Sequence, residues 1–321
     1  SGLDEVPGSI HLITSKELNR FSYSDPLRTL RTVSGVNITE EDGFGLRPNI
    51  GLRGSGTERS SRISIMEDGI LISPAPYTSS AAYYFPSIAR MSSIEILKGS
   101  SQIAFGPQTA AGAINLISSI IPDSSQATFI TDMGSFGSRK THTKVGGSKE
   151  TLKGTFGYLV EYLNLRSDGF KILDNGASTG FNKSDRLIKL RYSTPVSTSI
   201  SQSITVKVAD VDETSNETYL GLSDEDFILN PFRRYSASSE DVITSRQTQF
   251  VVTHKIALSK SLEFNTDFYS TTFDRNWYKL DRVIDSTGNV VKLGSVLDSP
   301  DSFSETFSYL SGSSTPDSAG L

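Results

Sequence analysis

The sequence predicts a membrane β-barrel with an N-terminal α+β domain, and two observations carry that prediction. Before Pro122 the chain mixes helical and strand signals, whereas after it the helical period disappears and alternating apolar and polar segments take over. The connections between these segments are mostly short and long in turn, as in up-and-down barrels that cross a membrane. No stretch approaches the roughly 18 apolar residues of a transmembrane helix, which excludes helical membrane proteins.

The composition excludes further classes of protein. The 321 residues carry a net charge of −5 at pH 7, whereas a nucleic-acid-binding protein needs a basic face. The chain has no cysteine, which excludes disulfide frameworks and thiol catalysis, and its three histidines lie far apart in the sequence. It contains no nucleotide-binding loop and no serine-hydrolase elbow. We therefore expect no enzyme activity, no catalytic residue, no metal site and no cofactor.

Two short helices are expected near the N-terminus. Thr14 and Glu17 form a capping-box pattern ahead of the first helix. Pro26 follows a Ser-Asp pair and suits the first position of a second helix, which would continue over residues 27–33.

Four buried strands complete this domain. Residues 63–66 and 70–72 are apolar runs joined through an Asp-Gly turn, which predicts a hairpin. Residues 93–97 and 113–117 predict two more strands, with a glycine-rich stretch between them. We therefore place an α+β domain at residues 1–125, which is a normal domain size.

The alternating segments that follow predict the first strands of a barrel wall, over residues 126–321. We expect seven strands, at residues 126–133, 138–147, 153–166, 183–193, 199–211, 245–257 and 262–274. The second, fourth and sixth connections are short, the third, fifth and seventh are long, and only the first departs from this order. We expect no helix after residue 126.

Alternation gives each strand one side toward lipid and one toward the lumen. The set expected to face lipid is Phe156, Tyr158, Val160, Tyr162, Ile204, Val206, Phe250 and Phe268. The set expected to face the lumen is Glu161, Lys189, Lys207, Gln249, Glu263 and Asp267.

A barrel that encloses the N-terminal domain as a plug needs about 22 strands, and bacterial single-chain barrels have even strand numbers. The polar C-terminal segment lacks the aromatic strand with which such barrels usually end. We therefore expect the chain to be a truncated, N-terminal part of a barrel of about 22 antiparallel strands.

Several short motifs of the N-terminal domain resemble, in order and spacing, the plug of TonB-dependent outer-membrane transporters. They are Gly51-Leu52-Arg53-Gly54, Glu67-Asp68-Gly69, Ile94-Glu95-Ile96-Leu97-Lys98-Gly99, Phe105-Gly106 and Gly112-Ala113-Ile114-Asn115. Four further segments resemble the ferric-citrate-receptor branch, namely Pro74-Ala75-Pro76-Tyr77, Phe105-Gly106-Pro107-Gln108, Tyr219 to Asp224, and Pro231 to Tyr235. Ala104 departs from this branch, which has a basic residue there. The expected ligand is therefore an anionic or polar ferric chelate, and a larger siderophore rather than citrate itself.

The resemblance implies a function, a location and partners. It implies TonB-dependent import of a ferric chelate through the bacterial outer membrane, driven by the TonB–ExbB–ExbD complex, with outer-membrane lipid and lipopolysaccharide around the barrel. The TonB box is expected upstream of Ser1. Three alternatives remain open: the same fold as a receptor or structural subunit of a larger outer-membrane assembly, import of a non-iron nutrient, or a secreted all-β adhesin or hydrolase.

The resemblance also suggests site residues. Arg53 and Lys98 match plug positions that pair with carboxylates of the barrel wall. Tyr77 and Gln108 lie in loops that the family presents at the outer apex of the plug, where they could contact a ligand. Arg233 and Arg234 lie in a long external loop, and arginine suits an anionic ligand.

One acidic segment could instead bind calcium. Asp210, Asp212, Thr214 and Asn216 alternate as at the start of a calcium loop. Ser215, however, stands where such a loop needs glycine, and Gly221 where it needs glutamate. A solvated acidic strand end is therefore the expected structure.

Overall fold

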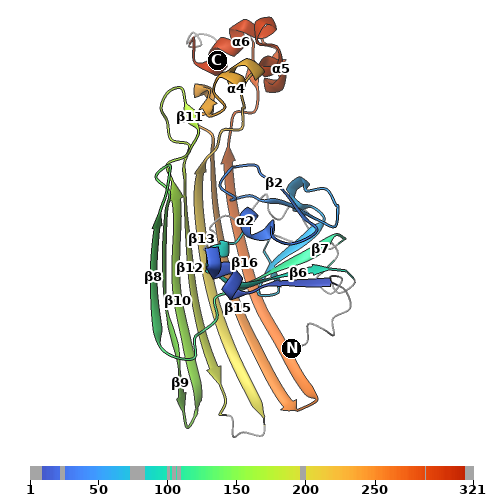
Figure 1. Ribbon diagram of the computed structural model, residues 1–321, viewed down its shortest axis with the longest axis vertical. Coiled ribbons are helices and arrows are strands. Elements are labelled where there is room, and N and C mark those ends of the chain that lie inside the picture. Colours follow the sequence, from blue (N-terminus) through green and yellow to red (C-terminus); the bar gives the residue numbers. More distant parts are fainter. Residues whose placement is uncertain are drawn as a thin grey trace.

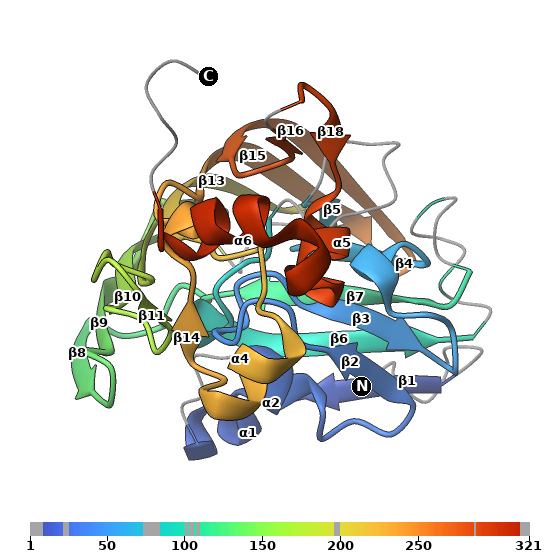
Figure 2. The same cartoon turned by 90° about the horizontal axis from the view of Figure 1, so that it is seen from above.

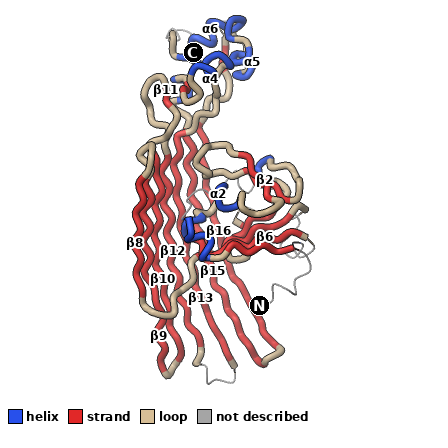
Figure 3. The backbone as a smooth tube through the Cα atoms, in the orientation of Figure 1, coloured by secondary structure: helices blue, strands red, loops and turns tan. Residues whose placement is uncertain are grey.

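A small α+β plug lies against the concave side of a curved wall of long strands in the computed structural model (Figure 1). The structure describes residues 9–21, 26–72, 84–99, 102, 106, 110–195, 200–285 and 287–314. Strands make up the wall and the central sheet of the plug, loops connect them, and helices occur in the plug and at one end of the wall (Figure 3). Within the described residues, no helix is both long and apolar enough to cross a membrane.

The plug is built on a five-stranded sheet of order β1-β6-β7-β4-β5, in which β4 and β7 are parallel. Its strands and α-helices are β1 (Ser9–Ile13), α1 (Ser15–Phe21), α2 (Pro26–Leu30), β2 (Val36–Thr39), β3 (Asn49–Leu52), β4 (Ile63–Glu67), β5 (Ile70–Leu71), β6 (Met91–Lys98) and β7 (Gly112–Ser118). Its core is aliphatic, with Ile50, Leu52 and Ile94 fully buried. The four strands expected from the apolar runs are confirmed.

Local signals at the helix ends and turns explain these elements. Thr14 and Glu17 exchange backbone-to-side-chain hydrogen bonds of 2.8 and 3.4 Å, which confirms the capping box ahead of α1. Helix α2 begins at Pro26 but ends at Leu30, so it is shorter than expected. Asp68 and Gly69 have φ of 53° and 81°, the left-handed pair that a two-residue hairpin turn of type I′ requires.

The wall is a seven-stranded antiparallel sheet in which every strand pairs with its neighbours along the chain. Its strands are β8 (Gln126–Met133), β9 (Arg139–Thr151), β10 (Gly154–Ser167), β12 (Phe181–Ser193), β13 (Ser201–Asn216), β15 (Val242–Ser259) and β16 (Leu262–Tyr278). All seven expected strands are present, and most are longer than expected because the pairing continues beyond the alternating segments. The described sheet is open, so the number of strands in a closed barrel stays a prediction.

The two faces of the wall differ as alternation predicts. On the convex face Phe156, Val160 and Phe268 are exposed, with relative accessibilities of 55%, 50% and 67%. On the plug side Glu161, Lys207 and Gln249 are buried. Lys189 also faces the plug, and Asp267 lines a cavity on this side, whereas Glu263 is exposed on the last strand.

The long connections gather at one end of the wall and contain helices (Figure 1). These elements are β11 (Ile172–Leu173), α4 (Asp224–Leu229), β14 (Arg233–Arg234), β17 (Val283–Ile284), β18 (Val290–Val291), α5 (Leu293–Asp298) and α6 (Ser304–Ser311). The expectation of no helix after residue 126 is therefore wrong. Helices of six to eight residues are too short to show a helical period in a sequence window, and α4 is fixed by its cap, since Ser223 accepts a hydrogen bond from the Asp226 amide.

The helices α4, α5 and α6 form a cap that lies over the plug when the molecule is seen from the loop end (Figure 2). A small apolar core joins α5 and α6 to the neighbouring loops, with Leu220, Tyr235, Val291, Val296 and Leu310 all buried in one cluster. Helix α4 is linked to it through Tyr235, whose hydroxyl lies 2.6 Å from Asp226 Oδ2. The wall curves around one side of the plug in the same view. A ligand that reaches the plug from the loop end therefore meets this cap.

Candidate plug–wall interface and ligand site

Arg90 is the centre of the contact between plug and wall. It ends the short helix η2 (Ile88–Arg90), and its side chain is only 1% exposed. Its Nη1 and Nη2 donate to Glu67 Oε1 and Oε2 at 2.9 and 2.6 Å, and its Nε donates to Asp185 of wall strand β12. The planar guanidinium suits this arrangement because it offers a fork to one carboxylate and a further donor to another.

Three cations and three carboxylates meet around Arg90, and we call them the central charge cluster: Glu67, Asp68, Arg90, Asp185, Lys189 and Lys207. Lys207 of β13 donates to Glu67 and Asp68 at 2.6 and 2.7 Å. Plug and wall contribute unlike charges to each pair that crosses the interface. The cluster is therefore balanced only while the plug is seated.

Two opposing effects set the pKa values of the plug carboxylates in this cluster: burial raises them, and the neighbouring cations lower them. Burial alone would raise the pKa of the Glu67 carboxyl, but Arg90 and Lys207 outweigh it and lower that pKa to about 2. The pKa of Asp68 is also lowered, because Lys207 and Lys189 outweigh the effect of its burial. Burial raises the pKa of the neighbouring Tyr84 phenol well above its usual value. Both plug carboxylates are thus ionised at neutral pH.

A second group of charges lies closer to the loop end, and we call it the apical charge cluster: Asp42, Arg47, Lys183, Glu213 and Glu217. Arg47 of the plug donates to Glu213 and Glu217 at 2.6 and 2.7 Å. Burial opposes the charge on Arg47, yet the two glutamates outweigh it and raise its pKa. Lys183 of β12 lies 3.4 Å from Glu213 and donates to the Phe85 carbonyl oxygen of the plug at 2.8 Å.

The loop that carries Arg47 is shaped by Asp42. The Asp42 carboxylate accepts hydrogen bonds from the backbone N–H groups of Phe44, Leu46 and Arg47 at 2.6, 3.2 and 2.8 Å. These bonds fix the turn that presents Phe44 to the wall loops, where its ring lies 5.2 Å from that of Phe170. The plug therefore contacts the external loops through aromatic rings as well as through charges.

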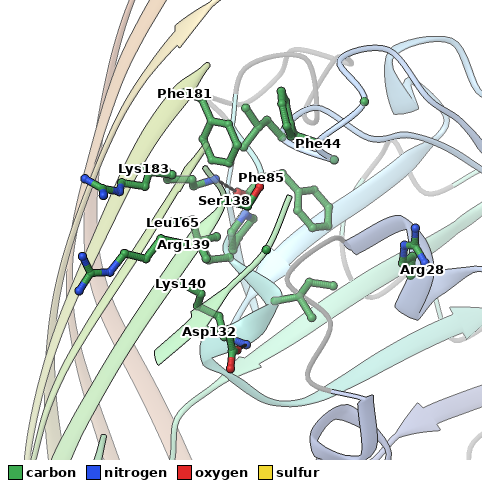
Figure 4. A pocket seen from close by; sticks show the side chains of 18 of the residues that line it. Arg28, Phe44, Phe85, Asp132, Ser138, Arg139, Lys140, Leu165, Phe181 and Lys183 are labelled. Atoms are coloured by element: carbon green, nitrogen blue, oxygen red, sulfur yellow. Dashed lines mark hydrogen bonds and ion pairs between the residues drawn. The ribbon is translucent and has the colours of Figure 1, made fainter. Parts of the chain in front are cut away.

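A cavity of about 380 Å³ lies between this loop and wall strands β8 to β12. Figure 4 shows Phe44, Phe85 and Phe181 grouped at one end and Asp132 with Lys140 at the other. Asp132 and Lys140 form an ion pair of 2.5 Å within the wall. The cavity thus has an aromatic part next to a charged part, which is typical of a site that holds an amphipathic small molecule.

The expected site residues are only partly described. Tyr77 and Gln108 lie outside the described residues. Arg53 is exposed at a φ of 56°, and its backbone N–H donates to the Gly35 carbonyl oxygen at 2.9 Å. Lys98 donates to the Ser34 carbonyl oxygen at 2.8 Å. Since these contacts lie within the plug, the pairing of Arg53 and Lys98 with wall carboxylates stays a prediction.

The two loop arginines differ in their partners. Arg233 is paired with Asp174 at 2.9 Å and Asp226 at 2.5 Å, so its charge is already neutralised within the loops. Arg234 donates to the Pro231 and Arg233 carbonyl oxygens, and its Nε has no hydrogen-bond partner among the described residues.

A lysine from the neighbouring loop adds a second positive charge beside Arg234. Strands β11 and β14 pair Leu173 with Arg234, which brings Lys171 close to it. Burial and then the charge of Arg234 lower the pKa of Lys171.

Sequence reasoning missed Arg47, Arg90 and Asp185, which hold the plug most directly. Arg90 stands in an otherwise apolar stretch, and a lone arginine between Ile88 and Met91 was the available signal.

The acidic segment near Asp210 is not arranged as a metal site, because Arg186 pairs with Asp210 and Asp212 at 2.9 and 2.6 Å. In the part of the chain that the structure describes, no group of three or more His, Cys, Asp and Glu could hold a metal ion.

The plug, the wall and the charges between them define the architecture of this protein: a folded α+β domain held by buried ion pairs against the inner side of an open antiparallel sheet. Comparison with known proteins names the family of the plug, since residues 2–113 match the TonB-dependent Receptor Plug Domain. The proteins that match this chain are named as transporters and receptors, and the likeness to them extends over both the plug and the wall.

Individual relatives agree on the fold. The unliganded ferric citrate transporter FecA superposes with a TM-score of 0.71 at 20% identity, over 87% of this chain and 42% of that one. The ferric yersiniabactin uptake receptor FyuA of Yersinia pestis gives 0.63 at 16% identity, over 86% and 42%. The vitamin B12 transporter BtuB of Vibrio vulnificus strain YJ016 is 23% identical over 190 residues, which are 58% of this chain and 30% of the relative. The chain therefore spans less than half the length of these relatives.

Proposed function

We propose that this chain is the plug and the first wall strands of a transporter that imports an anionic ferric chelate across the outer membrane, energised by TonB with ExbB and ExbD. In this proposal residues 1–125 act as the plug and residues 126–321 form the beginning of a barrel of about 22 strands, surrounded by lipid and lipopolysaccharide. The observation that carries the proposal is the polar nature of the plug–wall contact.

Buried ion pairs suit a plug that must move. A buried ion pair adds little net stability compared with apolar packing, because desolvation offsets the attraction, but it fixes one arrangement of its partners. The central and apical charge clusters therefore fix the plug in one position, beside the apolar contacts that Val211 and Phe273 of the wall make with the plug core. A pull on the plug would then have to break a limited number of directional contacts.

The charge at the loop end supports an anionic ligand. Lys171 and Arg234 carry like charges close together, and the guanidinium of Arg234 makes no ion pair among the described residues. An anion between them would relieve the repulsion and supply the missing acceptor. Arg233, fixed by Asp174 and Asp226, would hold the loop in place, while Tyr77 and Gln108 would contact the ligand from the plug.

The test is binding of labelled ferric chelates to the complete protein, compared between wild type and the variants Lys171→Ala, Arg234→Ala and Gln108→Ala. Loss of one charge-assisted contact should weaken binding roughly tenfold or more. Arg246→Ala is the matched control, since Arg246 lies on the outer face of the wall and pairs with Asp210. Unchanged binding in all three variants would show that the ligand sits elsewhere.

A non-iron nutrient is the second candidate, and the match to a vitamin B12 transporter favours it. Cyanocobalamin in the same binding experiment separates the two: binding of the vitamin and of no ferric chelate would establish the second candidate. Binding of neither would favour a receptor or structural subunit of a larger outer-membrane assembly.

A further inference from the structure

Two lysines of the wall face each other across neighbouring strands. Lys189 of β12 and Lys207 of β13 are directly paired in the register of the sheet. Both point toward the plug, with side chains 12% and 4% exposed. Like charges at directly opposed positions destabilise a sheet unless something compensates them.

The compensation comes from the plug. Lys207 Nζ lies 2.6 Å from Glu67 Oε1 and 2.7 Å from Asp68 Oδ2, and Lys189 Nζ lies 3.7 Å from the same Asp68 oxygen. In the described part of the chain, every ion pair of these two lysines goes to the plug. Lys183 of the same wall differs, because it has the wall carboxylate of Glu213 at 3.4 Å.

The plug holds its carboxylate in place through the hairpin turn. Asp68 adopts a φ of 53°, and its Oδ1 accepts a hydrogen bond from the Ser118 backbone N–H at 2.9 Å. Next to it lies a polar cavity of about 390 Å³, lined by Asp68, Asn115, Lys189, Lys207, Lys255 and Asp267. A small anion therefore has room to approach the two lysines from the side of the plug.

We propose that Lys189 and Lys207 form an anion-binding site on the inner wall, occupied at rest by the Asp68 carboxylate of the plug and taken over by an anionic cargo when the plug withdraws. The inference rests on the proposed function, which supplies the cargo. Withdrawal of the plug removes every ion-pair partner that these two ammonium groups have in the described part of the chain, and a carboxylate of the cargo replaces the one that has left. Cargo and seated plug then exclude each other at this site.

The first experiment replaces the plug carboxylate by a soluble one. Asp68→Gly removes the carboxylate, and glycine accepts the positive φ of the turn. In the complete protein purified in detergent, we expect acetate to raise the thermal unfolding midpoint of Asp68→Gly and to leave wild type unchanged. Acetamide, which has the same shape without the charge, should have no effect.

Two further variants locate the acetate. The stabilisation by acetate should disappear when Asp68→Gly is combined with Lys189→Gln and Lys207→Gln. It should persist when Asp68→Gly is combined with Lys255→Gln, which removes a lysine of the same cavity. Equal effects of acetate and acetamide, or rescue that survives the loss of both lysines, would overturn the proposal.

The second experiment measures transport and does not depend on the stability of Asp68→Gly. Lys189→Gln keeps the two contacts of Lys207 with the plug, so the plug remains seated. Uptake of the ferric chelate should slow roughly tenfold. Chelate binding at the external loops is measured in parallel, so that a defect in binding can be distinguished from a defect in transport past the plug. Unchanged uptake in Lys189→Gln would overturn this inference alone, whereas no uptake of any ferric chelate by wild type would overturn the proposed function.

Discussion

Arg90 shows how one residue can connect two parts of the molecule. It lies between Glu67 of its own domain and Asp185 of the wall, and it is almost completely buried. Each carboxylate has lost water on burial and depends on the guanidinium for compensation. The ion pairs of Arg90 therefore add little net stability to the folded protein. Removing one partner, however, leaves the other as an uncompensated buried charge, which is strongly destabilising.

Arg90→Met should release the plug from the wall. Two carboxylates would remain buried without their main counter-charge, which costs about 3–5 kcal/mol. The plug of the complete protein should unfold at a lower denaturant concentration and be cleaved faster by protease. Arg246→Met is the control, because this arginine is 65% exposed and pairs on the outer face, where an ion pair contributes less than about 1 kcal/mol. Equal stability of the two variants would contradict the role assigned to Arg90.

The low pKa of Glu67 predicts an acid limit for plug seating. Its pKa is about 2 in the folded protein and 4.5 as the ordinary value, so its contribution is fully present above pH 4.5 and is lost as the pH falls toward 2. The stability difference between wild type and Glu67→Gln should be constant from pH 7 to about 4.5 and shrink below it. Denaturant unfolding at a series of pH values measures this difference. A difference that already shrinks between pH 7 and 6 would point to another titrating group.

At the scale of elements, the loop between β2 and β3 joins the plug to the external loops. Asp42 fixes its backbone, Arg47 reaches two wall glutamates, and Phe44 packs on Phe170 and Phe181. Gly43 has a φ of 80°, and a Cβ there would lie 2.7 Å from the ring of Phe170. The close approach of loop and ring therefore needs glycine at this position.

Gly43→Ala should disturb this contact more than Gly35→Ala does. Both glycines have positive φ, so both variants lose about 1–2 kcal/mol to backbone strain, but a Cβ at Gly35 meets nothing within 4 Å. Only Gly43→Ala must also displace Phe170. Hydrogen exchange of residues 40–47 and of the loop around Phe170 should rise in Gly43→Ala alone. A similar rise in hydrogen exchange in both variants would show that backbone strain, and not the contact with the Phe170 ring, causes the change.

At the scale of the whole molecule, the wall separates two environments. Its outer face carries exposed apolar side chains together with the ion pairs of Arg186 and Arg246 toward the loop end, and its inner face carries the charges that hold the plug. A lysine or arginine placed at the lipid midplane destabilises a barrel by roughly 2–4 kcal/mol, so the charged inner face could not be turned toward the lipid.

The absence of cysteine allows a direct test of this orientation. Single cysteines at Val208 on the outer face and Thr253 on the inner face can be introduced without background. In membranes, Thr253→Cys should react with a water-soluble maleimide, whereas Val208→Cys should not. The fluorescence of a lipid-soluble dye attached to Val208→Cys should instead be quenched by a spin label on the lipid chains. The opposite pattern would place the wall inside out.

The sequence by itself determined the strands of the wall, their order and their faces, because alternation with a period of two depends only on neighbouring residues and on the two solvents they meet. In the plug it predicted four strands, whereas β1, β2 and β3 were not expected. The start and end of β8 agree with the expected strand, and Glu161, Lys189 and Lys207 lie on the expected side.

Which charges meet was decided only by the tertiary structure. Arg90 and Asp185 are 95 residues apart, and Arg47 and Glu213 are 166 apart, so no local pattern links them. Helices α5 and α6 of the cap are likewise fixed by packing around Tyr235 and Leu310 rather than by their own periodicity. Pairing across such distances depends on how two domains dock, and docking is a property of surfaces that exist only after each domain has folded.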